Sequence, residues 1–291
     1  MEISIDFSVE ELVVLSRQLN MAPPATLGEL SSISEEAVEV ARRALVARRV
    51  VSAAPGAAGE PLRTAGETEE SKARDALYDM VYVMCAPALK VEVTRRASVT
   101  EDVWFILALP EAAIEQAQVC EGVFRCTPFR TEEVPGRLKM RAQLTDRVAP
   151  LATGASLSGY LLRRLVSCLN EVDEADREKA RDACRGSGDT DAANKVVELL
   201  LDASAWLNVS VENRETREAG GTIVEAREVA WVDGGAGGLW RVPSEIELDQ
   251  YDPSHAFDVS PTTQSDLEVD LRSMFSTTQT APLEAQPESQ A

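Results

Sequence analysis

A short pattern that occurs twice constrains the fold of this chain more than any other feature. Gly122–Cys126 and Gly238–Val242 both have the order glycine, apolar, aromatic, arginine, apolar. The first copy continues through Thr127-Pro128 into a predicted helix. The second, after an insertion, continues through Ser260-Pro261 into another predicted helix. Internal repeats set the architecture of a chain, so the pattern predicts two related units.

The expected elements follow the same order in both halves: helices, a long helix, a strand, a longer hairpin and a final helix. Strands that are consecutive in sequence tend to pair antiparallel, and helices beside such a sheet give an α+β fold. Duplication adds a pseudo-two-fold axis, with two sheets that lie side by side or are continuous. The expected strands are 2–7, 89–93, 103–107, 113–119, 123–127, 206–211, 222–232 and 239–242. The expected helices are 8–19, one from about 32, 68–85, 135–144, 157–169, 173–183, one from 189 or 190 and one ending near 275.

Capping signals and composition refine these boundaries. Ser8 precedes Glu11 by three residues, as in a capping box, and Ser32 stands in the same relation to Glu35. Residues 113–119 fit a helix or a strand, and the repeat favours a strand. We expect an N-terminal half over 1–150, a C-terminal half over 151–276 and a disordered tail over 277–291. Residues 52–66 have the composition of a linker, and residues 243–256 form an acidic insertion absent from the first copy.

The charge balance excludes several classes of partner. The chain has 49 acidic and 29 basic side chains, which give a net charge of −20. Such a surface repels nucleic-acid phosphates and anionic membranes, so neither nucleic-acid binding nor membrane insertion is expected. The start of the chain lacks the basic and apolar regions of a signal peptide, and no apolar run approaches the roughly 20 residues of a membrane helix. We therefore expect a cytoplasmic protein.

The residues that carry catalysis are scarce. His255 is the only histidine, and no nucleophile motif surrounds it. The five cysteines are scattered without a C-x-x-C pair, which argues against a zinc site and fits small core residues. The run Gly234–Gly238 lacks the lysine of a phosphate-binding loop and precedes a strand, so we expect a mobile hairpin tip. The sequence predicts no catalytic residue, no cofactor and no metal, and hence a protein that is not an enzyme.

Tryptophans of the second half are the candidate partner-binding residues. Trp231 and Trp240 lie on the two predicted strands of the second-half hairpin, and Val232 lies beside the first of them. Tryptophan is enriched among the residues that dominate protein–protein binding energy. These three residues could border a binding surface, and the alternative is that both tryptophans fill the core.

The order of several segments resembles the EspG-type secretion-associated chaperones of actinobacterial type VII (ESX) secretion. The likeness rests on four segments spread over nearly the whole chain. They are the strand and Leu/Val helix at Ile5–Leu12, the helix end at Leu45–Val51, the helix, proline and strand at Met84–Pro87, and the hairpin from Trp231 to Val242 with the closing helix after Ser260. The resemblance implies a central antiparallel sheet flanked by two helical bundles with quasi-two-fold symmetry.

The same resemblance implies a cytosolic chaperone. Its partner would be a secreted helical protein of the PE/PPE or WXG type, whose exposed apolar tip the chaperone covers. The polar tail and the acidic insertion depart from mycobacterial members of the family. An alternative function is a non-enzymatic structural or regulatory interaction domain unrelated to secretion. An enzyme would need a polar cleft that the sequence does not predict.

Overall fold

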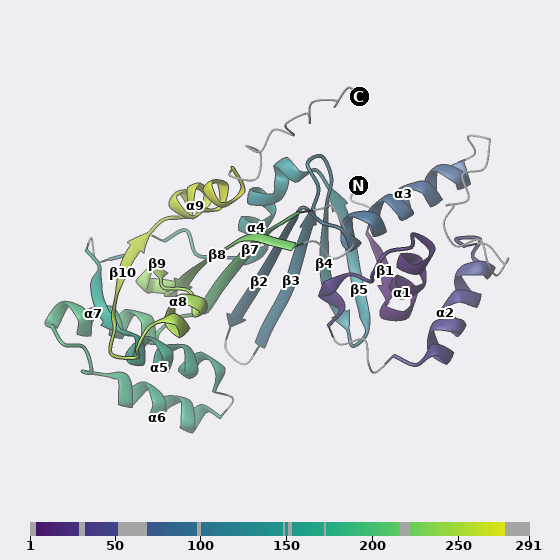
Figure 1. The fold of residues 1–291 in the computed structure, drawn as a ribbon. Helices are drawn as coiled ribbons and strands as arrows, with labels where there is room; N and C mark the ends of the chain where they lie inside the picture. The colour runs from purple at the N-terminus through teal and green to yellow at the C-terminus, as the bar shows by residue number, and fades with distance from the viewer. Residues whose placement is uncertain are drawn as a thin grey trace, which may run out of the picture.

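One antiparallel sheet of ten strands runs through the computed structural model (Figure 1). The structure describes residues 4–28, 33–51, 69–97, 100–147, 149–150, 153–171, 173–215 and 222–276. Within these residues the strand order is β1-β5-β4-β3-β2-β7-β8-β9-β10-β6. The predicted α+β class is confirmed, and the sheet is continuous across the two halves because β2 pairs with β7. Residues 52–66 and the tail 277–291 lie outside the described residues.

The two halves of the chain each contribute five of these strands. In the N-terminal half the elements are β1 (Ile5–Ser8), α1 (Val9–Gln18), η1 (Ala25–Leu27), α2 (Glu35–Ala47), α3 (Glu69–Cys85), β2 (Leu89–Ala97), β3 (Thr100–Ala108), β4 (Ala113–Cys120), β5 (Val123–Phe129), η3 (Thr131–Glu133) and α4 (Val134–Ala142). In the C-terminal half they are β6 (Ala155–Ser158), α5 (Gly159–Asn170), α6 (Glu174–Cys184), α7 (Asp191–Leu201), β7 (Ala205–Glu215), β8 (Thr222–Asp233), η4 (Gly235–Gly237), β9 (Leu239–Val242), α8 (Glu245–Gln250), β10 (Ala256–Thr262) and α9 (Gln264–Ser276).

Helices cover the sheet in three places (Figure 1). One group, α1–α3, lies at the β1 end, and a second group, α5–α7, lies at the β6 end; each encloses its own apolar core. The helices α4 and α9 pack against each other and cover a third core in the middle of the sheet. Alternation along the strands separates these cores, because successive side chains of a strand point to opposite faces. On β3, for example, Ile106 belongs to the core under α4 and α9, and Leu107 belongs to the core of α1–α3.

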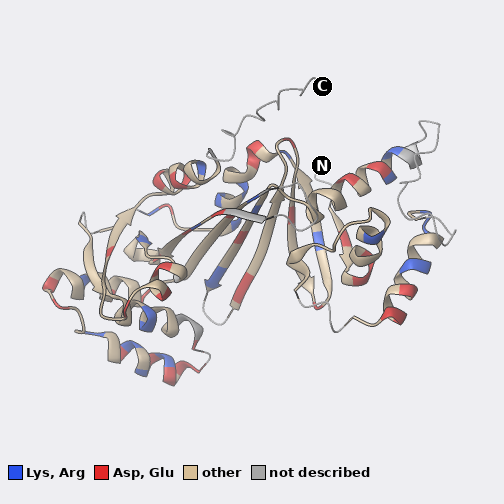
Figure 2. Ribbon diagram, in the orientation of Figure 1, with Lys and Arg blue, Asp and Glu red and all other residues tan. Residues whose placement is uncertain are grey.

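Charged side chains lie on the outer helices and also along the strands of the sheet (Figure 2). Figure 2 shows acidic and basic residues interspersed along α6, the predicted charged helix over 173–183. Asp173 caps this helix by accepting from the backbone N–H groups of Ala175 and Asp176. None of the helices in the described part of the chain has the length and apolarity needed to cross a membrane.

The strand order reads the same from either edge of the sheet. From one edge it is β1-β5-β4-β3-β2, and from the other it is β6-β10-β9-β8-β7. At the junction Val93 pairs with Val209, and the register continues evenly to either side. This is the order that duplication requires, and the superposition of the two halves stays a prediction.

Equivalent details recur at the two edges. Ser8 ends β1 and caps α1, and Ser158 ends β6 and caps α5. The first N–H of each helix donates to the residue before the neighbouring strand, from Val9 to Gly122 at 2.9 Å and from Gly159 to His255 at 2.9 Å. These registers align β5 with β10.

The repeated pattern that predicts the duplication matches two strands that do not correspond in the sheet order. Gly122–Cys126 leads into β5 and Gly238–Val242 leads into β9, and these strands occupy different places in the sheet order. By its place in the sheet, Val123–Phe129 (β5) corresponds to Ala256–Thr262 (β10). Pro128 of β5 pairs with a residue of β4, and Pro261 of β10 pairs with a residue of β9. Alternating apolar and polar residues arise on any strand with one covered face, so the pattern was too general to identify equivalent strands.

Two strands were absent from the predicted elements, and one predicted cap differs. Residues 155–158 form β6 where the start of a helix was expected, and the end of the acidic insertion joins β10. β6 is a four-residue strand at the sheet edge, and β10 lies between it and β9. Residues 113–119 lie in β4, which confirms the choice of strand over helix. Ser34 caps α2, and the expected cap Ser32 lies outside the described residues.

Candidate partner-binding surface

The three predicted partner-binding residues are buried. Trp231, Val232 and Trp240 are 0%, 1% and 0% exposed. Trp231 packs in the core under α4 and α9, whereas Val232 and Trp240 pack on the other face in the core of α5–α7. Trp240 also donates its indole N–H to the carbonyl of Gly237 at 2.9 Å. Their burial favours the alternative that these side chains fill the core.

The glycine run at the end of this hairpin is packed, in contrast to the mobile tip expected from the sequence. The buried carboxylate of Asp233 accepts from the backbone N–H of Gly235 and from that of Thr145, both at 2.8 Å. Gly237 lies against Leu199 of α7 so closely that an added Cβ would stand 3.3 Å from it. The run is rich in glycine because the chain must turn tightly against a helix.

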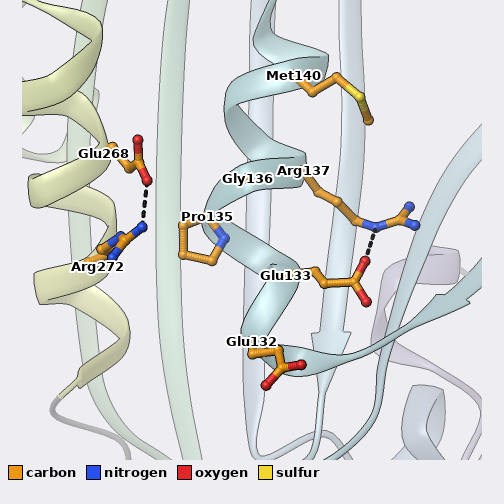
Figure 3. Close-up of a pocket in the computed structure, with 8 residues that line it drawn as sticks. All are labelled: Glu132, Glu133, Pro135, Gly136, Arg137, Met140, Glu268 and Arg272. Atoms are coloured by element: carbon orange, nitrogen blue, oxygen red, sulfur yellow. Dashed lines mark hydrogen bonds and ion pairs between the residues drawn. The ribbon is translucent and has the colours of Figure 1, made fainter.

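An open groove lies where α4 and α9 meet (Figure 3). We call it the α4–α9 groove. Its volume is about 590 Å³, and Arg272 and Glu268 of α9 lie across it from Pro135 of α4. Met140 is 70% exposed, which is high for an apolar side chain in a folded protein. The lining residues are Glu132, Glu133, Pro135, Gly136, Arg137, Met140, Glu268 and Arg272.

A larger hollow continues the groove toward the end of the sheet. Its volume is about 1000 Å³, and it shares Glu132, Pro135 and Arg272 with the first. Eight of its thirteen lining residues are apolar: Ala88, Leu89, Ala108, Leu109, Pro110, Val134, Pro135 and Phe275. The charged side chains are Glu111, Arg130, Glu132 and Arg272. An apolar floor with charged side chains at its margin is the general form of a protein docking site.

Ion pairs fix the helix that forms one wall of this groove. Glu115 of β4 is 8% exposed and pairs with Arg141 and, at 3.7 Å, with Arg137 of α4. Arg137 stacks over Phe129 at 4.2 Å from the ring centre, and Arg141 lies over Trp104 at 5.1 Å. Both guanidinium groups therefore contact the sheet below, and Arg137 also lines the groove.

A second exposed apolar surface lies at the edge of the C-terminal half. We call it the aromatic patch. The rings of Tyr251 and His255 stack with centres 4.5 Å apart, and Phe257 meets His255 edge-on at 4.8 Å. Tyr160 lies next to this group because its backbone N–H donates to Pro253. Tyr160, Tyr251 and nearby Ile246 of α8 are all about half exposed.

The middle of the sheet face that carries the two bundles is polar. Lys90 of β2 pairs with Glu92 at 3.1 Å and with Glu212 of β7 at 3.5 Å. Arg214 pairs with Glu212 at 2.5 Å. This row of ion pairs suits water better than an apolar helix, and the α4–α9 groove is the better candidate for apolar docking.

The described residues hold little chemistry of other kinds. No group of three histidine, cysteine or acidic residues within them is placed to hold a metal ion. Burial raises the pKa of both the Cys85 and the Cys126 thiols to about 12, which makes these thiols poor nucleophiles. His255 is exposed and contacts aromatic rings.

A ten-stranded antiparallel sheet with a helical group at each end defines the fold class of this chain as α+β. The fold is similar to a solved structure of the Mycobacterium tuberculosis type VII secretion system chaperone EspG5 in complex with a PE25–PPE41 dimer. The similarity covers 98% of this chain and 99% of that chain, with a TM-score of 0.55 and 10% sequence identity. No family model matches the chain, and neither does any curated protein.

Proposed function

We propose that this chain is a cytoplasmic, non-enzymatic secretion-associated chaperone of an actinobacterial type VII secretion system. Its partner would be a helical secreted protein of the PE/PPE or WXG type, kept soluble before export. The observation that carries the proposal is the fold likeness to EspG5 over nearly the full length of both chains. The expectation that the protein binds neither nucleic acid nor membranes belongs to the same proposal and rests on its net charge of −20.

The α4–α9 groove is the docking surface that suits this function best. An apolar helical tip aggregates when it is exposed, and covering it needs an apolar surface that itself stays soluble. The groove offers Met140, Pro135 and the adjoining apolar hollow, with glutamates and arginines at its margin. Charged margins keep the empty groove wetted, and the overall negative charge opposes self-association.

Co-expression tests the proposed function directly. The chain is produced together with a PE/PPE-like pair, or with a WXG-type pair, from the same host, and the soluble fraction of the pair is measured with and without it. We expect a stoichiometric complex on size exclusion with light scattering, and a larger soluble fraction of the partner. An unrelated helical protein of similar size is the control.

The opposite outcome is equally clear. If every such pair stays as insoluble with the chain as without it, and no complex forms, the chaperone proposal fails. Specific capture of a partner with no secretion signal would favour the alternative, a regulatory or structural interaction domain.

A further inference from the structure

The sheet of the C-terminal half opens into a small hollow where β9 ends. β9 has 4 residues, whereas its neighbours β8 and β10 have 12 and 7. β8 pairs with β9 only from Ala230 onward, and β10 pairs with it only from Ser260 onward. Beyond the end of β9 the two longer strands border a hollow of about 210 Å³, which residues 228 and 229 of β8 and residues 257 and 258 of β10 help to line.

This hollow carries an excess of negative charge. Its charged lining residues are Glu228, Glu247, Asp258 and Arg241. Arg241 pairs with Asp270 of α9 at 3.3 Å. Glu228 and Glu247 each accept a hydrogen bond from a backbone N–H at the start of α8, at 2.9 and 2.8 Å. No lysine or arginine in the described part of the chain forms an ion pair with any of these three carboxylates, so a cation from outside can neutralise them.

Phe257 joins the hollow to the aromatic patch. Its ring lines the hollow and meets the rings of His255 and Tyr251 edge-on, with centres 4.8 and 5.8 Å apart. The same ring packs against the apolar core of α5–α7, and an added Cβ at Gly159 would stand 3.0 Å from it. An anchored aromatic ring and carboxylates without ion pairs therefore face the same small space.

Backbone hydrogen bonds hold the loop that carries these rings. The N–H groups of Gly159 and Tyr160, at the start of α5, donate to the carbonyls of His255 and Pro253 at 2.9 and 2.7 Å. The N–H of His255 donates to the carbonyl of Asp252 at 2.8 Å. A loop that is fixed before binding loses less conformational entropy when a partner docks, so exposed rings on such a loop favour association.

We propose that this hollow and the aromatic patch form a docking site for an arginine-containing segment of a partner protein. The guanidinium of the arginine enters the hollow, donates to the carboxylates of Glu247 and Asp258, and lies against the ring of Phe257. Apolar side chains next to the arginine cover Tyr251 and Tyr160. The site is separate from the α4–α9 groove, and the proposal does not depend on the proposed chaperone function.

The chemistry of the site favours arginine over lysine. A planar guanidinium stacks on aromatic rings and presents several donors to carboxylates, whereas an ammonium group is a compact and strongly hydrated charge. The chain already contains this combination, since Arg137 stacks over Phe129 at 4.2 Å from the ring centre and pairs with Glu115 at 3.7 Å. The net charge of −20 adds a long-range attraction for a basic segment.

The test follows His255, which is the only histidine and lies in the aromatic patch. Its ring proton signal in NMR spectra is recorded while the full chain is titrated with an acetylated and amidated peptide of repeated Leu-Arg-Leu-Gly units. We expect a saturable shift of that signal. A peptide with citrulline in place of arginine keeps the side-chain shape without the charge, and it should bind about tenfold more weakly. The lysine peptide should bind more weakly than the arginine peptide.

Three variants then locate the binding, with affinities measured by fluorescence anisotropy of the labelled arginine peptide. Asp258→Asn removes a carboxylate of the hollow, and Tyr251→Ala removes an exposed ring; each should weaken binding about threefold or more. Glu36→Gln removes one carboxylate at an exposed site on α2 and is the matched control, for which we expect the wild-type affinity. All three positions are exposed, so the variants should fold.

The proposal is overturned if the His255 signal does not move, or if the citrulline peptide binds as tightly as the arginine peptide. It is also overturned if Glu36→Gln weakens binding as much as Asp258→Asn does, because the overall charge would then attract the peptide without a defined site. Wild-type affinity in both Asp258→Asn and Tyr251→Ala would reject the site as well.

Discussion

The two halves of the molecule fix their covering helices with ion pairs of opposite polarity. In the N-terminal half Glu115 of β4 pairs with Arg137 of α4, and in the C-terminal half Arg241 of β9 pairs with Asp270 of α9 at 3.3 Å. Glu115 follows Ile114, which pairs with Pro128 of β5. In the same way Arg241 follows Trp240, which pairs with Pro261 of β10. The helix residues of the two ion pairs, Arg137 and Asp270, each lie nine residues after the proline of their own half. An ion pair between strand and helix needs one acidic and one basic residue, and it does not matter which of the two lies on the strand.

The two pairs differ in burial. Side-chain exposure is 11% for Glu115 and 14% for Arg137, but 50% for Arg241 and 23% for Asp270. A buried charge that loses its partner costs far more free energy than an exposed one. Positions that are equivalent in architecture can therefore differ widely in their contribution to stability.

Large side chains at equivalent strand positions should give the largest effects. Trp240 is 0% exposed and Ile114 is 2% exposed, each in the core of its own half. We expect Trp240→Ala to lower the free energy of unfolding by about 3–5 kcal/mol and Ile114→Ala by about 2–5 kcal/mol. Denaturant melts measure both. A cost below about 1 kcal/mol for Trp240→Ala, with partner binding lost, would restore the predicted role of this residue at the interface.

The ion pairs of reversed polarity should show the next largest difference. Glu115→Ala leaves Arg137 and Arg141 without their shared carboxylate, and we expect a loss of about 3 kcal/mol in the free energy of unfolding. Arg241→Ala should cost no more than about 1 kcal/mol, since the Arg241 side chain is half exposed. Urea titrations of the two variants make the comparison. If the two variants lose equal amounts of unfolding free energy, burial does not set the contribution of these ion pairs.

The two serine caps should differ by less. Ser8 and Glu11 form a capping box in which each side chain bonds to the other residue's backbone N–H. Ser158 accepts from Leu161, whose side chain cannot return the bond. We expect about 1 kcal/mol for each serine-to-alanine change, with the larger loss at Ser8. Thermal melts of the two variants measure the difference, and a larger loss at Ser158 would contradict the argument.

His255→Ala should have the smallest effect, within about 0.5 kcal/mol of the wild-type free energy of unfolding. The ring is exposed and stacks on Tyr251, which is itself about half exposed. The corresponding site in the N-terminal half is the turn residue Gly122, which has no side chain. A variant that folds normally but loses partner binding would show that the aromatic patch is functional.

Local signals in the sequence predicted most of the elements. The capping box at Ser8 and the alternation along β2 were sufficient because they depend on neighbours in sequence. The choice of strand for residues 113–119 depended on the repeat. β6 was missed because its four residues, Ala-Ser-Leu-Ser, have weak strand preference and become a strand by pairing with β10. The correspondence between halves was misassigned because distant pairings, rather than short motifs, define it.

The α4–α9 groove was not predictable from local pattern either. Its walls come from helices that are more than a hundred residues apart, and only the sheet brings them together. The sequence did contain one usable signal, since Met140 falls on the face of α4 opposite its buried residues Leu138 and Ala142. Tryptophan content suggested Trp231 and Trp240 as binding residues instead, and both lie in the core. A large aromatic residue is at least as useful in a core as at an interface.

Calorimetric titration of the purified helical partner into wild-type protein and three matched variants tests the proposed function and its site most directly. Met140→Glu places a charge in the α4–α9 groove, Ile246→Glu places one beside the aromatic patch, and Val40→Glu places one on α2 at a similarly exposed site. We expect wild-type binding, a loss of about tenfold or more in affinity for Met140→Glu, and unchanged affinity for the other two. A wild-type chain that does not bind would contradict the chaperone function. Loss at Ile246→Glu with Met140→Glu unaffected would contradict the groove as its site.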